Sequence, residues 1–413
     1  CVVLPPPPPR RRLFSFSALR ASTCNPLIKE TVAMSKPLRI AIAGLGTVGG
    51  GVVKVLQTHR DMLAARAGRA LDIVAVSARS RSKDRGSDLS TYAWEDDPVA
   101  MAKRDDYDLF VECIGGEDGP AKVAVEAALK AGRHVVTANK AMLAHHGQAM
   151  AEAAEATGAA LRFEAGVAGG IPAVKALTEG LAANAITRVS GVINGTCNYI
   201  LTEMERRGAD YGDILREAQE KGYAEADPSF DVGGIAAAHK LALLAATAFG
   251  ARVDFGGVVI EGIERISLTD IEHARLLGYR IKLLGVARFA EDGLEQRMQP
   301  CLVPESAPLG QLEGVTNMVV FEGDFVGETV FAGPGAGEGP TASAIVADII
   351  DIARGLTLPA FGIPAAQLKA APRATLGTEA GYYLRFALAD QPGVLAQLAT
   401  VLGKNGISKH RGQ

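Results

Sequence analysis

The sequence has little cysteine, no long apolar run and no excess of basic charge. Its formal net charge is −3 over 413 residues, so it offers no basic surface for nucleic acid. No run of roughly eighteen uncharged apolar residues is present that could span a membrane. The five cysteines lie far apart without a CxxC pair, which gives no sign of a disulfide framework or zinc site and favours a reduced, cytoplasmic protein. They are Cys1, Cys24, Cys113, Cys197 and Cys301.

Residues 1–33 differ in composition from the rest of the chain. They contain five consecutive prolines followed by three arginines, and no acidic residue precedes Glu30. Such a segment has too few apolar side chains to form a core. An Arg- and Ser-rich leader without acids fits an organelle transit peptide, and translated sequence upstream of the true start fits as well. We expect the functional protein to begin at Met34.

From Leu38 onward, strand-like apolar runs alternate with helical ones. This order predicts an α/β fold with a Rossmann-type, doubly wound parallel sheet, which we assign to residues 34–166. Residues 167–339 mix helices with strands and are expected to form an α+β domain for substrate binding and dimerisation. A helix in residues 340–357 is expected to return to the first domain, before a Pro- and Ala-rich linker over residues 358–379.

A glycine-rich turn follows the first strand and opens a helix. It reads Gly44-Leu45-Gly46-Thr47-Val48-Gly49. In this context the three glycines allow a tight turn, close approach of a pyrophosphate and close packing of helix on strand, while the helix N-terminus attracts the phosphates. The alternative is a glycine-rich turn without a ligand. The sequence predicts a bound dinucleotide, with Gly44, Gly46, Thr47, Val48 and Gly49 as its contacts.

The end of the second strand reads VSARSRSKDRG and carries Arg79, Arg81 and Lys83, without an acid at the strand end. An acid there would accept the ribose hydroxyls of NAD, whereas basic side chains accommodate the extra phosphate of NADP. The sequence therefore favours NADP, with Arg79 as a phosphate contact, and leaves NAD possible. The alternative is that these are ordinary solvated loop charges.

An acidic turn precedes a helix with one lysine, in the segment AQEKGYAEADPSFDVGGIAAAHK that ends at Lys240. The carboxylates of Glu225, Asp227 and Asp231 could hold a cationic amine, and Lys240 could meet the oxygen of a carbonyl or alcohol. These residue types together indicate an amino-acid-like substrate.

The same segment resembles the signature of homoserine dehydrogenases. The resemblance extends over roughly residues 38–377. It implies the reversible NADPH-dependent reduction of L-aspartate 4-semialdehyde to L-homoserine in threonine, methionine and isoleucine biosynthesis, by a homo-oligomer that is at least a dimer. One signature residue differs, because the expected aspartate four residues before the lysine is Ala236. The matching residues are Ala218, Gly222, Asp227, Pro228, Asp231, Gly234 and Lys240.

The resemblance also implies roles for individual residues. Lys240 would transfer the proton, and Lys140 would lie between nicotinamide and substrate, although a lysine after a strand is by default solvated. Glu225 would bind the substrate ammonium group. Thr196 lies in the segment NGTCNY at the substrate cleft, where helix capping is the alternative. The remaining implied contacts are Asp231 and Tyr223 for the substrate, and Gly222 and Gly337 for the cofactor.

A second glycine-rich turn, FEAGVAGGIP, contains the single carboxylate Glu164. Turns of this kind direct several carbonyl oxygens to one point and suit a hard cation. The resemblance implies a monovalent cation, sodium in similar enzymes, held by Glu164 and by the carbonyls of Val167, Gly169 and Ile171. A plain interdomain hinge is the alternative.

Ala236 keeps helix propensity but supplies no charge on the helical face that it shares with Lys240. The loss of one charge-assisted hydrogen bond costs on the order of 1.5 to 3 kcal/mol, or about tenfold to a hundredfold in kcat/KM. We therefore expect a folded, cofactor-binding protein with impaired turnover. Two alternatives remain, an NADP-linked dehydrogenase of another small aldehyde or alcohol and a non-catalytic nicotinamide-binding sensor.

Residues 380–413 resemble the first half of an ACT module, a small ligand-sensing domain. The segment YYLRFALADQPGVLAQLATVLGKNGIS has the pattern of a strand, a turn and a helix. It is about half as long as such a module, so we expect a truncated ACT-like segment with an unpaired edge and an exposed apolar face.

Overall fold

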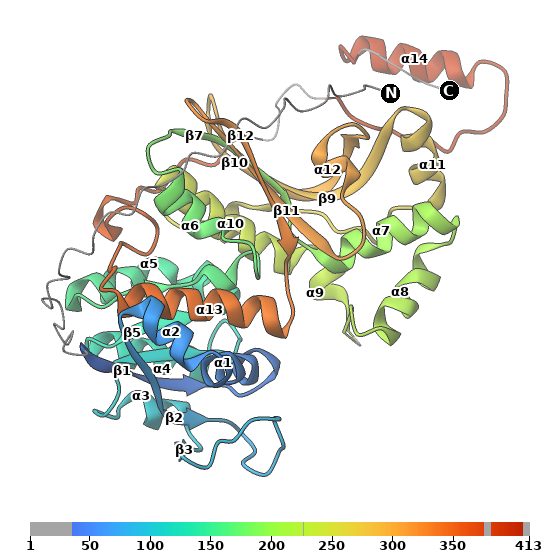
Figure 1. Cartoon of the computed structure of the whole chain (residues 1–413). Helices are drawn as coiled ribbons and strands as arrows, with labels where there is room; N and C mark the ends of the chain where they lie inside the picture. Colours follow the sequence, from blue (N-terminus) through green and yellow to red (C-terminus); the bar gives the residue numbers. More distant parts are fainter. Residues whose placement is uncertain (1–34, 226, 376–380, 408–413) are drawn as a thin grey trace, which may run out of the picture. The chain divides into compact units, whose positions relative to one another are not determined.

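The computed structural model describes residues 35–225, 227–375 and 381–407 (Figure 1). The predicted leader over residues 1–33 lies outside the described residues. Ser35 begins the first strand.

The first sheet has six parallel strands in the order β3-β2-β1-β4-β5-β6. This is the strand order of a Rossmann fold, so the predicted fold class is confirmed. Its strands are β1 (Ser35–Ala43), β2 (Arg69–Ser77), β3 (Ala93–Glu95), β4 (Leu109–Glu112), β5 (His134–Thr137) and β6 (Leu161–Arg162). Its helices are α1 (Thr47–Thr58), α2 (Arg60–Ala67), α3 (Pro98–Ala102), α4 (Pro120–Lys130) and α5 (Lys140–Thr157).

Both faces of this sheet are buried, as the near-continuous apolar strands require. Successive residues of β1 point to opposite faces. Ile40 and Ile42 join a core cluster with Val52 of α1, whereas Ala41 joins the cluster that contains Val125 of α4.

The helical stretch after β1 is divided into two helices, α1 and α2. His59 lies between them with φ −112° and ψ 24°, outside the helical region. The change of direction brings Leu63 and Ala67 of α2 into the core cluster on the α1 side of the sheet.

The second sheet is mixed, with the strand order β12-β11-β7-β9-β10-β8. Its pairs are antiparallel except for β10 with β8. The strands are β7 (Ile186–Val192), β8 (Val259–Ile260), β9 (Tyr279–Ala290), β10 (Gly293–Pro304), β11 (Thr316–Gly323) and β12 (Gly327–Pro334). The accompanying helices are α7 (Gly195–Arg207), α8 (Tyr211–Glu220), α9 (Ser229–Val232), α10 (Ile235–Phe249), α11 (Leu268–Leu276) and α12 (Pro308–Gln311).

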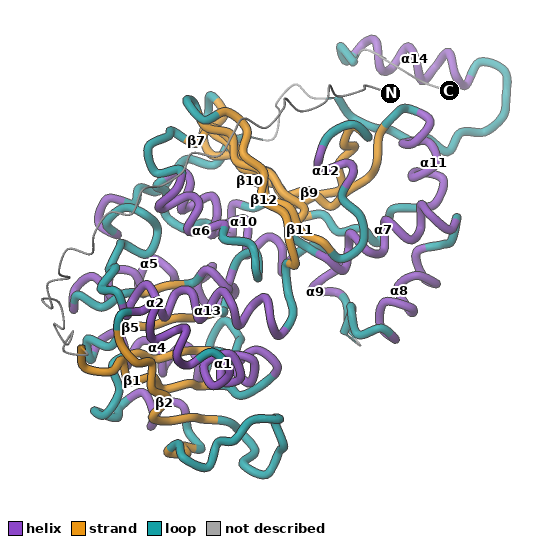
Figure 2. The backbone as a smooth tube through the Cα atoms, in the orientation of Figure 1, coloured by secondary structure: helices purple, strands orange, loops and turns teal. Residues whose placement is uncertain are grey.

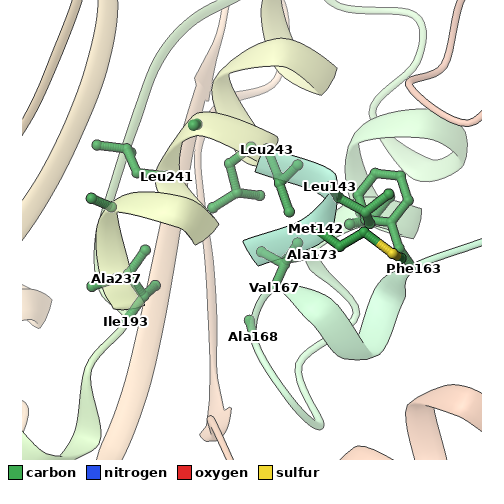
Figure 3. Close-up of a cluster of buried hydrophobic side chains, with 14 of the residues drawn as sticks. Met142, Leu143, Phe163, Val167, Ala168, Ala173, Ile193, Ala237, Leu241 and Leu243 are labelled. Atoms are coloured by element: carbon green, nitrogen blue, oxygen red, sulfur yellow. The ribbon is translucent and has the colours of Figure 1, made fainter. Parts of the chain in front are cut away.

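Helix α10 joins the two sheets. It packs against β7, β9 and β10 on one side and against α5 on the other, and Figure 2 shows two groups of strands with α5 and α10 between them. Figure 3 shows the shared core, in which Met142 and Leu143 of α5 lie near Leu243 of α10. Because α10 also carries Lys240, this packing fixes the lysine relative to the first sheet.

The segment between the sheets is short and irregular. It comprises η1 (Glu164–Gly166), α6 (Ala173–Lys175) and the π-helical turn η2 (Ala176–Gly180). Two further short elements are η3 (Phe255–Gly257) and η4 (Ala365–Gln367).

Helix α13 (Glu338–Ala353) follows β12 and packs beside α1 (Figure 1). The two helices approach so closely that a Cβ on Gly51 would lie 2.7 Å from Cγ of Glu338.

Near the C-terminus, the expected helix is present as α14 (Val394–Lys404), but residues 381–390 form no strand. A strand needs a neighbour to pair with, and no described strand pairs with this segment. It instead contacts α11, where Tyr383 Oη donates to Asp270 Oδ1 over 3.0 Å and Arg385 Nε lies 2.9 Å from the same oxygen. The ACT-like assignment therefore stays a prediction. Among the described residues, no helix is long and apolar enough to cross a membrane.

Candidate active site

The predicted dinucleotide turn has the backbone geometry that its glycines suggested. Gly44 has φ +92°, and a Cβ on it would lie 2.5 Å from the carbonyl carbon of Cys113. A Cβ on Gly49 would lie 1.9 Å from the carbonyl oxygen of Gly44. Gly46 and Thr47 are exposed at the N-terminus of α1, and a Cβ on Gly46 would meet nothing within 4 Å. The N-terminus of α1 is thus open to an anionic group.

Glu112, at the end of β4, holds the adjacent loop and the end of β5 together. Its buried carboxylate accepts hydrogen bonds from the N–H groups of Ile114 (2.7 Å) and Gly115 (2.9 Å) and from Oγ1 of Thr137 (2.5 Å). Glu112 was not among the residues predicted from the sequence, although an acid at the end of a buried strand was the available signal. Its hydrogen bonds position the carboxyl edge of the sheet, where ligands bind in this fold.

A cavity of about 300 Å³ opens at this edge. It lies between the first sheet and α10, and its wall includes the predicted catalytic Lys140. The lining residues are Gly115, Gly116, Glu117, Ala138, Asn139, Lys140, Ala141, Phe230 and His239.

Lys140 is the first residue of α5 and is not a solvated surface lysine. Asn139 caps this helix, since its Oδ1 accepts from Met142 N (3.1 Å) while its Nδ2 donates to Gly116 O (2.7 Å). Burial lowers the pKa of Lys140, and the negative charges of Asp231 and Glu225 partly oppose that shift. The lysine and these two predicted substrate-binding acids are therefore close enough to interact electrostatically.

The pKa of Lys240 is lowered strongly. Its Nζ donates to the backbone carbonyl of Ile193 over 3.0 Å. Burial lowers its pKa to about 7, the positive charge of Lys140 adds to this effect, and Asp231 opposes it. Burial raises the pKa of Asp231, against the influence of both lysines. A lysine with a pKa near neutrality can both donate and accept a proton at physiological pH.

The turn before α7 ties these elements together. The Oδ1 of Asn194 caps α7 by accepting from Cys197 N (2.9 Å), and its Nδ2 donates to the backbone oxygen of Asp231 (2.9 Å). Thr196 is not the cap; its Oγ1 donates to the backbone oxygen of Tyr223 over 2.6 Å. The capping alternative for Thr196 is thus replaced by a link between α7 and the acidic turn. Sequence reasoning missed the double role of Asn194.

The remaining predicted residues of the acidic turn are exposed. Tyr223 is 43% exposed and its ring lies 5.0 Å from that of Tyr199 in an edge-on arrangement. Gly222 has φ +72°, and Glu225 is held through its backbone oxygen, which accepts from Gln219 (3.0 Å). The carboxylate of Glu225 remains available to a ligand.

Two other predicted positions lie at helices α10 and α13. Ala236 lies on α10 one turn before Lys240 and is only 7% exposed, so an apolar methyl group occupies the position of the expected aspartate. Gly337 has φ +113° and precedes α13, the helix beside α1. A non-glycine residue there would be strained.

His239 is a cavity residue that sequence reasoning also missed. It is 2% exposed and its Nδ1 has no hydrogen-bond partner in the described part of the chain. Its ring centroid lies 4.2 Å from that of Phe255 and 5.5 Å from that of His145. Burial lowers its pKa to about 4, with further contributions from His145 and Lys140, so the ring is neutral at physiological pH. The only sequence signal was its position before Lys240.

The predicted cation site lies at η1. Both carboxylate oxygens of Glu164 accept backbone N–H groups, from Val174 (2.9 Å) and Lys175 (2.8 Å). Burial, followed by the charge of Asp348, raises the pKa of Glu164 to about 7. Burial raises the pKa of Asp348 to about 6, even though Lys175 lies 3.2 Å away. Burial is the largest cause of both shifts, so both carboxyl groups hold their protons more tightly than exposed carboxyl groups do.

The three predicted carbonyl ligands in the same turn differ in whether they already accept a hydrogen bond. The oxygen of Ile171 accepts from Ala173 N over 2.8 Å, whereas the oxygens of Val167 and Gly169 accept no hydrogen bond from any described residue. Gly169, with φ +59°, packs so closely against the loop after β12 that its Cβ would lie 2.5 Å from the carbonyl of Gly335. The turn thus packs tightly against the loop after β12, and it also presents two carbonyl oxygens without a hydrogen-bond donor among the described residues. Within the described residues, no group of three or more His, Cys, Asp or Glu side chains forms a metal site.

Comparison with known proteins gives one consistent result. The family model described as homoserine dehydrogenase matches residues 172–350, and the model described as homoserine dehydrogenase, NAD binding domain, matches residues 44–164. The chain is 45% identical over 380 residues to the homoserine dehydrogenase of Neisseria gonorrhoeae, covering 90% of this chain and 87% of that one. It is also 45% identical over 382 residues to the Pseudomonas aeruginosa enzyme, with coverage of 90% and 87%.

A solved structure is similar over the same extent. The homoserine dehydrogenase from Thiobacillus denitrificans aligns with a TM-score of 0.85 and 42% sequence identity, covering 91% of this chain and 88% of that chain.

Proposed function

The chain belongs to the homoserine dehydrogenase family of NAD(P)-dependent oxidoreductases that act on a CH–OH group, and we propose that Lys240 is its proton-transfer residue. The observation that carries this proposal is the half-buried Lys240, whose ammonium group donates to the backbone carbonyl of Ile193 and whose pKa is lowered to about 7 by burial and by the charge of Lys140. The reaction is the interconversion of L-aspartate 4-semialdehyde and L-homoserine.

The cofactor fits the residues at the carboxyl edge of the first sheet. The open space at Gly46 and the free N-terminus of α1 suit a pyrophosphate. Gly44, Thr47, Val48 and Gly49 complete the turn. When bound, the nicotinamide cofactor supplies the hydride to the aldehyde or accepts it from the alcohol. We further propose that NADP is preferred, because Arg79 is exposed at the end of the second strand and can meet a phosphate.

The side chains divide the remaining work. In reduction, Lys240 gives a proton to the substrate oxygen, and Lys140 stabilises the negative charge that develops there. Glu225 binds the substrate ammonium group, and Asp231 adds a negative charge on the same side. In oxidation, the neutral amine of Lys240 takes the proton from the alcohol. Thr196 and Tyr223 line the substrate region, while Gly222 and Gly337 allow close approach to the cofactor.

A monovalent cation at Glu164 is part of the proposal. It is supported by the two buried carboxyl groups of Glu164 and Asp348 and by the carbonyl oxygens of Val167 and Gly169, which accept no hydrogen bond from a described residue. Ile171 would contribute its second lone pair, since its oxygen already accepts one hydrogen bond. The cation would fix the joint between the two halves of the chain and takes no part in proton transfer. A homodimer and a cytoplasmic location also remain expectations.

The comparisons favour an enzyme over a nicotinamide-binding sensor. We propose that Ala236 limits the turnover of this enzyme. We expect turnover below that of an enzyme with aspartate at this position. The test of function is NADP reduction with L-homoserine beside 4-hydroxybutyrate, which lacks the amino group. We expect oxidation of homoserine alone. Equal rates with both alcohols would favour a dehydrogenase of other small alcohols, and NADPH binding without any homoserine oxidation, even in Ala236→Asp, would favour the sensor.

A further inference from the structure

The loop after β2 is attached to the dinucleotide turn by one arginine. Arg85 Nε donates to the backbone oxygen of Leu45, inside the glycine-rich turn, over 3.0 Å. Its two terminal nitrogens donate to the backbone oxygens of Lys83 (2.7 Å) and Ser80 (2.5 Å). The guanidinium group therefore donates hydrogen bonds to three carbonyl groups, two within the loop and one in the glycine turn.

No other hydrogen bond or ion pair between described residues joins residues 79–87 to the rest of the chain. Inside the loop, only Ser80 with Ser82 and Asp84 with Gly86 form further hydrogen bonds. A loop with so few attachments would otherwise sample many conformations, at an entropic cost on ordering. Arg85 thus determines where the loop lies relative to the glycine turn.

The other three cationic side chains of the loop are available to an anionic ligand. The side chains of Arg79, Arg81 and Lys83 are exposed and pair with no acid in the described part of the chain. Arg81 and Arg85 both lie over the ring of Trp94, at 5.8 Å and 5.5 Å from its centroid. The indole is thus a common platform for the two guanidinium groups.

We infer that Arg85 is a positioning residue for selectivity between NADP and NAD. It keeps the loop that carries the cations Arg79, Arg81 and Lys83 next to the turn that would bind the pyrophosphate, where these side chains would be available to a 2′-phosphate. It does so through hydrogen bonds to carbonyl groups and not by contact with the phosphate. This inference rests on the proposed NADP preference.

Lysine is the informative replacement for Arg85. It keeps the positive charge, but a single ammonium cannot reach three divergent carbonyl groups in the fixed geometry of a guanidinium. A loss common to Arg85→Lys and Arg85→Ala would therefore report positioning, whereas a loss confined to Arg85→Ala would report charge. Arg60→Ala is the matched control, because Arg60 also belongs to the first sheet's domain and its side chain is 70% exposed. Among the described residues it pairs with Asp72 alone, over 3.1 Å.

The experiment measures dissociation constants of 2′,5′-ADP and 5′-ADP by calorimetry on the full chain. We expect both Arg85 variants to bind 2′,5′-ADP about tenfold more weakly than wild type, because the loop must be ordered on binding. Binding of 5′-ADP should change by less than about twofold, and Arg60→Ala should match wild type with both ligands. The 5′-ADP measurement also shows that each variant is folded.

Trp94 supplies a second readout, because it is the single tryptophan of the chain. Its fluorescence should change when 2′,5′-ADP binds to wild type, and this change should be smaller in Arg85→Lys. Wild-type affinity in Arg85→Lys, or an equal loss for both nucleotides, would overturn the positioning role. If wild type itself bound the two nucleotides equally, the proposed NADP preference would be wrong instead, and the selectivity role of Arg85 with it.

Discussion

The ammonium group of Lys240 donates a hydrogen bond to the backbone carbonyl of Ile193, at 3.0 Å, across the junction between α10 and the turn before α7. The next residue, Asn194, caps α7 and holds the backbone oxygen of Asp231. The proposed proton donor and the acidic turn therefore share one short piece of backbone. A change in that turn should affect Lys240 and the substrate-binding acids together.

The first prediction concerns Asn194→Ala, which removes the α7 cap and the link to Asp231. We expect the free energy of unfolding to fall by about 1 to 2 kcal/mol and kcat to fall as well, because the Ile193 carbonyl is no longer fixed. Asp210→Ala is the control, since Asp210 precedes α8 without making a side-chain cap hydrogen bond. Urea unfolding and steady-state kinetics measure both effects. Equal losses in the two variants would show that Asn194 has no special role.

The second prediction concerns Ala236→Asp. A carboxylate one helical turn before Lys240 should raise kcat/KM for homoserine by about tenfold to a hundredfold, through one charge-assisted hydrogen bond to substrate or lysine. Ala236→Asn separates charge from size, and its gain should be much smaller. An unchanged kcat/KM in Ala236→Asp would mean that this site does not use a carboxylate at position 236.

The third prediction concerns Glu225→Gln, which removes a charge and keeps the size of the side chain. We expect KM for homoserine to rise about tenfold or more, because the substrate ammonium loses a charged partner, while KM for NADP stays the same. Glu220→Gln, at the exposed end of α8, removes an equal charge outside the acidic turn. If KM for homoserine rose equally in both variants, the substrate would respond to the total negative charge of this region and not to Glu225 itself.

The fourth prediction concerns Glu164, whose pKa is raised to about 7, and Asp348, whose pKa is raised to about 6. Both carboxyl groups hold their protons more tightly in the folded chain than in the unfolded one. Without a cation, stability should therefore fall as the pH rises from about 4, near the pKa values of the unfolded chain, to about 7. A bound cation favours the ionised carboxylate and should flatten this decline.

Urea unfolding in sodium chloride and in choline chloride, at equal ionic strength, distinguishes these cases. We expect a steeper decline with pH in choline. Superimposable curves in the two salts would argue against a cation site and leave the interdomain joint as the role of this turn.

The sequence predicted the features that depend on local spacing. The glycine turn after β1, the lysine at the start of α5 and the acidic turn before α10 follow from the order of residues along the chain. Glu112 and the link from Asn194 to Asp231 were missed because they depend on hydrogen bonds to neighbouring elements, which a local pattern does not contain. The strand expected in residues 381–390 failed for the same reason, because pairing depends on a partner that a local pattern does not contain.

The most direct test of the account is the pH dependence of kcat/KM for homoserine oxidation with NADP. Wild type should gain activity as the pH rises through about 7, because the neutral amine of Lys240 is the base, and aldehyde reduction should lose activity over the same range. Lys240→Arg should show little activity and no such rise, since its guanidinium stays protonated. Equal rates and the same profile in wild type and Lys240→Arg would contradict the assignment of Lys240 as the proton-transfer group.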